Sequence, residues 1–260
     1  MTHSVQPVIN TALFSMSLHS APSTDAAWSD AFVVASPRLV VPQCGAIKLA
    51  QRKQQFVATP LTLLAVDASA PYRMRRFANA HVVSLVVVPK TIAISSGAQP
   101  MTIAQMIRLR ALLSALEKEP TRPLALEEFF ATSLQRSVGR DPTIREASPR
   151  VSRAVVTAQE FLADNTDRTI TLSDIARAAS ISPFHLARQF KSATGATLHQ
   201  SHVRLRIAKA IAHLDGGERN LTRLALDLGF ASHAHFSDVF RTIAGCTPTS
   251  YRKQAYCARS

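Results

Sequence analysis

The sequence LTRLALDLGFASHAHFSDVFR, residues 221–241, has the pattern of two short helices joined by a tight turn. Its first half places apolar residues at the i, i+3, i+4 and i+7 spacing of one helix face. Gly229 is suited to end this helix in the left-handed conformation, and Ser232 is suited to cap the next one. Phe236 and Phe240 are four residues apart and share one face of the second helix. The stretch predicts a helix-turn-helix, whose second helix can enter the major groove of DNA.

A copy of this stretch lies about fifty residues earlier in the chain. A shift of 49 residues aligns the first helix and the turn, and a shift of 50 aligns the second helix after one extra residue. Such an internal repeat predicts two helix-turn-helix units in tandem. The aligned pairs are Leu172 with Leu221, Ile175 with Leu224, Ala176 with Ala225, Ala179 with Leu228, Ile181 with Phe230, Ser182 with Ser232, Leu186 with Phe236, Phe190 with Phe240, Lys191 with Arg241, Gly195 with Gly245, and Thr197 with Thr247.

The second unit continues a longer pattern of defined residue types. The pattern consists of Gly229, Phe230, Ser232, Phe236, Phe240, Arg241, Gly245, Thr247, Pro248, Tyr251 and Arg252. It resembles the signature of AraC/XylS-type transcription regulators, and the resemblance covers roughly residues 150–253. The chain departs from the family at Leu198, where proline is frequent, and at Ser201, where an aromatic residue is frequent. The first unit resembles the family at Ile175, Ala176, Ser182, Pro183, Leu186, Arg188, Phe190, Lys191 and Gly195.

The resemblance implies a cytoplasmic, sequence-specific DNA-binding transcription regulator with a two-domain α+β fold. Residues 1–140 would form a cupin-like β-barrel with two helices, for ligand sensing or dimerisation. Residues 150–255 would form an all-α, homeodomain-like tandem helix-turn-helix domain. Residues 141–149, with two prolines and several charges, are predicted to be the linker. The implied partners are double-stranded DNA, an unknown small-molecule effector, RNA polymerase and a second copy of the chain, with activation favoured over repression.

The formal net charge of +13 favours a polyanionic partner. Residues 1–140 contribute +7 (14 Lys and Arg against 7 Asp and Glu), and residues 141–260 contribute +6 (16 against 10), so charge alone does not locate a DNA site. Three cysteines in 260 residues favour a reducing compartment over a disulfide framework. The chain shows neither a signal-peptide pattern nor an apolar run of the ~18–20 residues that span a membrane, so no membrane partner is predicted.

The N-terminal half contains short β-rich runs separated by Pro, Gly and Asp, which predict an antiparallel sandwich or barrel. Two amphipathic helices are predicted at residues 100–116 and 125–138, and their apolar faces could pack on the sheets or on a second subunit. The predicted strands are residues 8–16, 31–35, 46–50, 55–59, 61–66, 72–76, 82–88 and 91–94.

Residues 56–73 resemble cupin-like sensing domains, and many cupins bind metal through His and Glu side chains. The sheet region offers only His81, so a metal-dependent enzyme is disfavoured and neither metal nor cofactor is predicted. Tyr72 and Arg73 could line a pocket for an anionic or polar ligand, with Arg75 nearby. The alternative is a solvated basic strand face.

The outward positions of the two second helices are the predicted DNA contacts. Arg188 can pair with guanine O6 and N7, and Phe184 and Ala187 can touch thymine methyl groups. Asp238 can accept from cytosine N4 or pair with Arg241, and the second helix is expected to read DNA more loosely because it has fewer cations. The resemblance implies base contacts by Phe184, Ala187, Arg188, His233, Ala234 and Asp238. The predicted phosphate contacts are Ser182, Lys191, Ser232, Arg241 and Arg252.

Two other functions are compatible with the same sequence. A cupin-type enzyme with a DNA-binding tail would need an acid/base, nucleophile or metal constellation, and no such set is apparent. A non-specific architectural DNA binder would show equal affinity for any sequence, whereas a regulator prefers its site by about 10³-fold or more.

Overall fold

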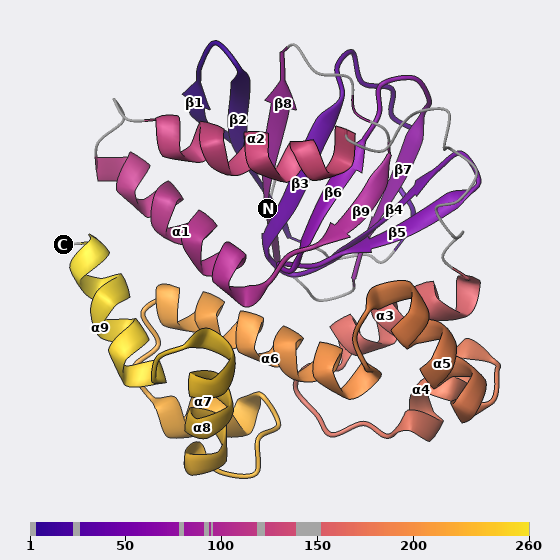
Figure 1. Cartoon of the computed structure of the whole chain (residues 1–260), viewed down its shortest axis with the longest axis vertical. Coiled ribbons are helices and arrows are strands. Elements are labelled where there is room, and N and C mark those ends of the chain that lie inside the picture. The colour runs from indigo at the N-terminus through magenta and orange to yellow at the C-terminus, as the bar shows by residue number, and fades with distance from the viewer. Residues whose placement is uncertain are drawn as a thin grey trace. The chain divides into compact units, whose positions relative to one another are not determined.

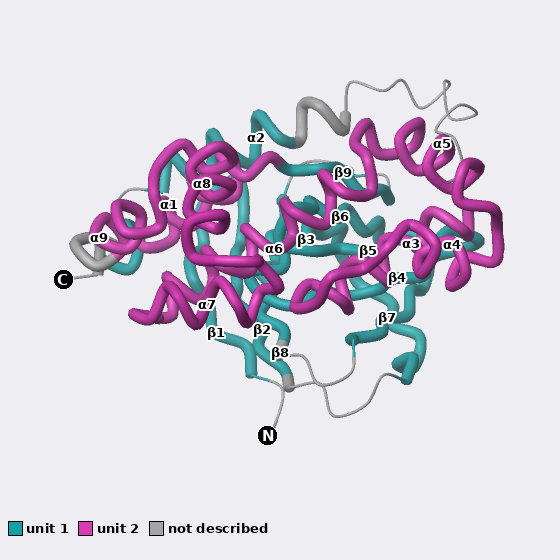
Figure 2. Tube along the Cα trace, turned by 90° about the horizontal axis from the view of Figure 1, so that it is seen from below, with its two compact units in different colours: residues 1–101, 115–151 teal, residues 102–114, 152–260 magenta. Residues whose placement is uncertain are grey.

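The computed structural model describes residues 4–22, 27–77, 81–90, 94, 96–118, 123–138 and 152–259. The chain divides into two compact units, shown in separate colours in Figure 2. Unit 1 comprises residues 1–101 and 115–151, and unit 2 comprises residues 102–114 and 152–260. The predicted linker, residues 141–149, lies outside the described residues. None of the described helices is long and apolar enough to cross a membrane.

Unit 1 is built from antiparallel strands (Figure 1). The strands are β1 (Ser4–Asn10), β2 (Phe14–Pro22), β3 (Arg38–Cys44), β4 (Ile47–Gln51), β5 (Gln54–Ala58), β6 (Thr62–Val66), β7 (Tyr72–Arg76), β8 (His81–Pro89) and β9 (Gly97–Pro100). They form a six-stranded sheet of order β1-β2-β8-β3-β6-β9 and a three-stranded sheet of order β5-β4-β7.

These sheets are open, and the closed barrel expected from the sequence is not seen. Strands β1 and β9 are the edges of the larger sheet, β5 and β7 are the edges of the smaller one, and no pairing joins the sheets among the described residues. Val40, Leu64 and Val86 of the larger sheet share one buried cluster with Ile47 and Leu49 of the smaller sheet. The two sheets therefore enclose a common apolar core, which matches the sandwich alternative.

Strand β3 lies between β8 and β6, and the sequence did not predict it. Its proline, Pro42, argues against a strand, because proline cannot donate a hydrogen bond to a neighbour. In the structure, Pro42 lies where the β3–β8 register shifts, between Pro42 and Cys44. A ladder tolerates proline at such an irregularity. Strand β9 was missed as well. The predicted strand at residues 31–35 is instead an isolated bridge between Phe32 and Tyr72.

The predicted strand at residues 8–16 is not continuous, because it contains the end of β1, a reversal of the chain and the start of β2. The Thr11 side chain accepts hydrogen bonds from the N–H groups of Leu13 and Phe14, both at 3.2 Å. This local side-chain bonding competes with extended structure and turns the chain. The predicted strand at residues 91–94 lies largely outside the described residues.

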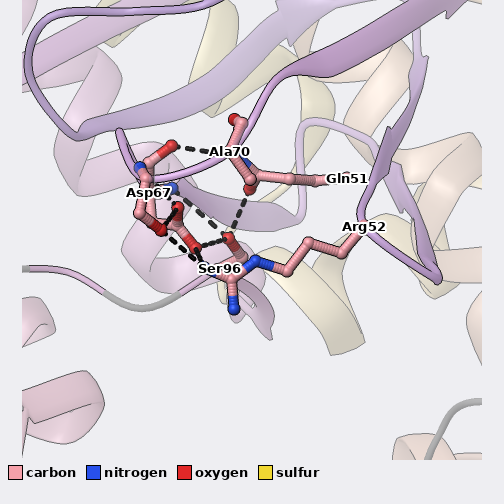
Figure 3. Close-up of polar contacts among 6 residues, drawn as sticks. Gln51, Arg52, Asp67, Ala70 and Ser96 are labelled. Carbon is pink, nitrogen blue, oxygen red and sulfur yellow. Dashed lines mark hydrogen bonds and ion pairs between the residues drawn. The ribbon is translucent and has the colours of Figure 1, made fainter.

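A buried polar network joins the end of β4 to the segments after β6 and before β9 (Figure 3). The Gln51 amide donates to the carbonyl oxygen of Asp67 at 3.0 Å, and the Ser96 hydroxyl bonds to both Gln51 and the Asp67 carboxylate. Burial alone would raise the pKa of Asp67. Hydrogen bonds from Ser69 and Ser96, with the charge of Arg52, hold that pKa below its usual value. The hydrogen-bonding capacity of these buried polar groups is met within the network, which therefore stabilises the loops that carry them.

Two helices follow the strands, as predicted. They are α1 (Ile103–Lys118) and α2 (Leu124–Val138). Each buries an apolar face, which includes Met106 and Leu109 on α1 and Leu126 and Phe130 on α2. The first part of α1, up to residue 114, belongs to unit 2.

Unit 2 is otherwise all helical, and its long helix α6 runs between the group α3–α5 and the group α7–α9 (Figure 1). The predicted two-domain α+β architecture, with a C-terminal helix-turn-helix domain, is confirmed. The helices are α3 (Arg153–Asp164), α4 (Leu172–Ala179), α5 (Pro183–Thr194), α6 (Leu198–Asp215), α7 (Leu221–Asp227), α8 (His233–Ala244) and α9 (Pro248–Arg259).

Candidate nucleic-acid interface

Helix α4 begins with a capping box. The Thr171 hydroxyl accepts from the N–H of Asp174 at 3.2 Å, and the Asp174 carboxylate accepts from the N–H of Thr171 at 3.0 Å. The helix ends at Ser180, which has a left-handed φ of 56°. The N–H of Ile181 then donates back to the Ala176 carbonyl at 3.2 Å, which closes the turn.

Helix α5 starts directly after this turn. The Ser182 hydroxyl accepts from the N–H of His185 at 3.4 Å, and Pro183 occupies the first helical turn, where its missing N–H costs nothing. Gly195 ends the helix with φ of 74°. The chain therefore enters and leaves α5 at defined residues.

The second helix-turn-helix, formed by α7 and α8, repeats this construction. The N–H of Phe230 donates to the Ala225 carbonyl at 3.0 Å, as Ile181 does to Ala176 in the first unit. The Ser232 hydroxyl accepts from the N–H of His235 at 3.1 Å and caps α8. Gly229 has φ of 69°. The internal repeat inferred from the sequence is thus a repeat of backbone hydrogen bonds as well as of residue types.

The inner faces of α5 and α8 pack in the core and stabilise the two helix-turn-helix pairs. Leu186 and Phe190 of α5 are buried, as are Phe236 and Phe240 of α8. Phe240 contacts the ring of Phe236 at a centroid distance of 5.7 Å and that of Tyr251 in α9 at 6.0 Å. These aromatic contacts fix which face of α8 points outward.

The outer face of α5 brings together the predicted base-contacting residues. Phe184 is 91% exposed, Arg188 is exposed and Ala187 is half-buried. Lys191, the predicted phosphate contact, is exposed one turn further along. Within the described part of the chain, the side chains of Arg188 and Lys191 take part in no hydrogen bond or ion pair. The helix thus presents an apolar ring beside two available cations.

The outer face of α8 carries His233, Ala234 and Asp238, all exposed. The Asp238 carboxylate is 3.0 Å from the Arg241 guanidinium, and both side chains are mostly exposed. Of the two roles considered for Asp238, the structure contains the ion pair. An exposed pair of this kind is weak, so DNA can compete for either partner. The α8 surface therefore offers fewer available cations than the α5 surface.

The predicted phosphate contacts differ in how available they are. The Ser182 and Ser232 hydroxyls accept backbone hydrogen bonds and still carry a hydrogen to donate. Arg252 donates through Nη1 to the Arg219 carbonyl at 2.6 Å and keeps further N–H groups for a phosphate. Arg241 is shared with Asp238.

Gln189 was not predicted from the sequence, and it anchors α5. Its Oε1 accepts from the Ser152 hydroxyl, the N-cap of α3, at 2.9 Å, and its amide bonds to His185 one turn earlier. The partner lies 37 residues away in the chain, so no local pattern could indicate it.

Comparison with known proteins identifies the family. Residues 175–254 match a family model described as a helix-turn-helix domain. The chain is 31% identical over 98 residues to the regulatory protein SoxS of Salmonella typhimurium, which covers 38% of this chain and 92% of SoxS. The chain belongs to the AraC/XylS family of transcription regulators. It is therefore a DNA-binding transcription regulator.

Two further likenesses are weaker. The MmsAB operon regulatory protein of Pseudomonas aeruginosa is 26% identical over 94 residues, which are 36% of this chain and 31% of that protein. The chain thus spans less than a third of that relative. Wild-type ToxT from Vibrio cholerae is 14% identical with a TM-score of 0.40, covering 94% of this chain and 96% of ToxT. A score of this size adds nothing to the family assignment.

In this AraC/XylS-family regulator, α6 carries two buried polar residues that the sequence did not mark as important, His202 and Arg206. The Nε2 atom of His202 is 2.8 Å from the Asn165 carbonyl, so this nitrogen carries the hydrogen. Burial lowers the pKa of His202 below its usual value. The hydrogen bond to Asn165 opposes that effect, and the charges of Arg206 and His199 add to it.

His202 predicts a pH dependence of stability. Its folded-state pKa lies below the unfolded value of about 6.5, so its neutral form is favoured by folding. The stability it contributes is fully present above about pH 6.5 and is lost as the pH falls toward the folded pKa. We expect the melting temperature to fall more steeply between pH 7 and 5 in the wild type than in His202→Gln, which keeps a donor but cannot titrate. His213→Gln, an exposed position on the same helix, should behave like the wild type, and identical slopes in all three proteins would contradict this role.

Asp215, at the end of α6, joins three helices of unit 2. Its carboxylate accepts from the Tyr251 hydroxyl of α9 at 3.0 Å and pairs with Arg110 of α1 at 2.6 Å. Burial, together with the neighbouring Asp215 carboxylate, raises the pKa of Tyr251 well above its usual range. The phenol therefore stays protonated and donates its hydrogen bond at any physiological pH.

The two residues predicted to line a ligand pocket are not brought together. Tyr72 is buried in the apolar cluster of unit 1, and its ring lies 5.9 Å from that of Phe32. Arg73 is exposed and donates to the Ser29 carbonyl at 3.0 Å. Adjacent residues on a strand point to opposite faces, so they cannot share one pocket wall. Among the described residues, no group of three His, Cys, Asp or Glu side chains could hold a metal ion.

Proposed function

We propose that this regulator recognises a specific DNA sequence by inserting α5 and α8 into two successive major-groove segments of one duplex. One observation carries this proposal. Two copies of the same capped helical pair bury one face of the second helix completely and leave the other face open. Phe184, 91% exposed on a helix with available cations, has no role in the fold of unit 2 that would explain it. An apolar ring in that position suits a thymine methyl group.

Base readout is assigned to the outer residues of the two helices. Arg188 has the planar fork that pairs with guanine, while Phe184 and Ala187 supply apolar contacts. The base contacts at the second segment are assigned to His233, Ala234 and Asp238, of which Asp238 can accept from cytosine N4. With Asp238 held by Arg241, the second helix contributes less affinity than the first. The phosphate contacts that set the register are assigned to Ser182, Lys191, Ser232, Arg241 and Arg252.

Unit 1 is proposed to sense a small-molecule effector and to form a homodimer, as cupin-like domains do in this family. Its two-sheet core and its fastened loops supply a stable scaffold. The resemblance further favours activation through contact with RNA polymerase and a cytoplasmic location. The proposed domains are residues 1–140 and 150–255, with a linker at residues 141–149.

Selection of bound duplexes from a random pool tests this proposal. The full chain should enrich one bipartite motif, with two conserved segments about ten base pairs apart. The enriched duplex should bind about 10³-fold more tightly than a shuffled duplex at the same salt concentration. Equal affinity for both duplexes would instead support a non-specific architectural binder. Repeating the selection with candidate small molecules tests whether an effector acts on unit 1.

Arg188→Ala should weaken binding to the selected duplex by roughly 5- to 150-fold, the equivalent of about 1–3 kcal/mol, and should relax the preference at one base pair. The melting temperature should not change, because Arg188 is exposed. Lys191→Ala is the matched control. It should weaken binding to all sequences alike and reduce the salt dependence by about one phosphate contact. An unchanged base preference in Arg188→Ala would show that Arg188 does not read a base.

A further inference from the structure

Arg206 lies in the middle of α6 and is only 8% exposed. Its guanidinium makes three hydrogen bonds, each to a different backbone carbonyl. Nε donates to Thr166 at 3.1 Å, Nη2 donates to Arg168 at 2.7 Å, and Nη1 donates to Gly229 at 3.1 Å. The side chain is therefore held at every one of its nitrogens.

Two of these carbonyls lie in the segment that leads into the first helix-turn-helix, and the third lies inside the second. Thr166 and Arg168 lie in the connection between α3 and α4, ahead of the first unit. Gly229 is the turn residue of the second unit, between α7 and α8. The guanidinium also lies over the ring of Phe230, 5.6 Å from its centroid. A single side chain of α6 thus contacts both the segment that leads into the first helix-turn-helix and the turn of the second.

The turn between α7 and α8 leaves room for Arg206 because Gly229 has no Cβ atom. A Cβ atom on Gly229 would lie 2.6 Å from Nη2 of Arg206 and 3.0 Å from the Asp167 carbonyl oxygen. Only glycine leaves room for the guanidinium to reach the backbone here, in addition to suiting the left-handed φ. The close approach links the turn of the second unit to the segment that leads into the first.

The chemistry of the contact makes it directional. Burial lowers the pKa of Arg206, yet arginine stays charged in proteins, so its three bonds are charge-assisted. The guanidinium is planar and its donors point in fixed directions, so the carbonyls must keep their places around it. Apolar contacts between helices tolerate small shifts, whereas a shift of either turn would leave a buried donor or carbonyl unpaired.

We propose that Arg206 is the positioning residue that fixes the offset between the two recognition helices, and hence the spacing between half-sites that this regulator accepts. The proposal rests on the function proposed above, in which α5 and α8 read successive major-groove segments. Each base pair inserted between the half-sites moves the second one by about 3.4 Å along the axis and rotates it about 34° around the duplex. A rigidly joined pair of helices cannot follow such a change, but a loosely joined pair can.

The test measures binding of the full chain to the selected duplex and to versions with one, two or three base pairs inserted between the half-sites. The wild type should lose about 100-fold or more in affinity on a two-base-pair insertion. Arg206→Met keeps the length of the side chain but none of its donors. It should bind the native spacing about 10-fold more weakly and lose less than about 10-fold further on the same insertion. Arg204→Met is the matched control, since it removes a cation from an exposed position of the same helix. It should lose as much affinity on the insertion as the wild type does, and this loss is the spacing penalty.

The positioning role is overturned if Arg206→Met is folded, as judged by circular dichroism and a cooperative melt, and still shows the full wild-type penalty. If that variant does not fold, Arg206→Lys replaces it. Lysine keeps the charge but cannot reach three carbonyls at once, so the penalty should again shrink, and a full penalty would overturn the role. Failure of the proposed function gives a different result. The wild type would then not prefer the native duplex to a shuffled one, and the spacing role would fall with it.

Discussion

Phe240→Ala should lower the free energy of unfolding of unit 2 by about 3–5 kcal/mol. Phe240 is 0% exposed, and its ring contacts those of Phe236 and Tyr251. Alanine would leave a cavity between α8 and α9, and the surrounding rings cannot collapse fully into it. Since a domain is stable by only about 5–15 kcal/mol, much of unit 2 should unfold near physiological temperature. Thermal and urea melts followed by circular dichroism measure the effect.

Phe184→Ala makes the same chemical change on the opposite face of the equivalent helix and serves as the control. Because Phe184 is almost fully exposed, its removal should leave the free energy of unfolding within about 0.5 kcal/mol of the wild type. Binding to the selected duplex should nevertheless weaken. A wild-type melt for Phe240→Ala, or a large loss of stability in Phe184→Ala, would mean that the inner and outer faces are assigned the wrong way round.

Gly229→Ala should destabilise unit 2 by about 2–5 kcal/mol. A left-handed φ costs a residue with a Cβ atom about 1–2 kcal/mol, and forcing an extra atom into a packed site costs about 1–3 kcal/mol more. The new Cβ would lie 2.6 Å from the Arg206 guanidinium and 3.0 Å from the Asp167 carbonyl oxygen, so the neighbouring groups would have to move. Urea melts at fixed pH give the change directly.

Gly245→Ala is the matched control, because it separates backbone strain from the close contact. Gly245 has a similar φ of 80°, but a Cβ atom there meets nothing within 4 Å. Its replacement should therefore cost only the strain, about 1–2 kcal/mol. Equal costs at the two glycines would show that the approach of Arg206 to Gly229 adds no constraint.

Much of unit 2 could be predicted from the sequence because its signals are local. Thr171 with Asp174, Ser182 with Pro183, and the paired glycines at 195 and 245 begin or end helices by contacts within one turn. The internal repeat strengthened the prediction, since the two aligned copies indicated the same helix-turn-helix. The position of Arg188 on the outer face followed from helical spacing once Leu186 and Phe190 were assigned to the core.

Unit 1 was harder to predict because its pairings are distant in sequence. Strand β3 has proline at Pro42, and only the register shift against β8 explains why the strand tolerates it. Whether strands close into a barrel or form two sheets depends on edge pairings that no local pattern shows. The Gln51–Asp67–Ser96 network likewise joins residues up to 45 positions apart.

The polar contacts around the candidate interface were missed for the same reason. In the sequence, Arg206 looks like one of several exposed cations on its helix. It is in fact buried, and its hydrogen-bond partners lie 23 to 40 residues away, where no local pattern could indicate them. Gln189 reads as an exposed amide, and its partner Ser152 caps another helix. Asp238 illustrates the opposite case, because Arg241 is three residues away and the ion pair was foreseen as an alternative.

Footprinting of the full chain on its selected duplex tests most directly whether α5 and α8 occupy successive major-groove segments of one duplex. Guanine N7 protection and hydroxyl-radical cleavage together report the groove and the face of the duplex that the protein covers. We predict two protected major-groove patches about ten base pairs apart on the same face. A single protected patch, or two patches on opposite faces of the duplex, would contradict the proposal.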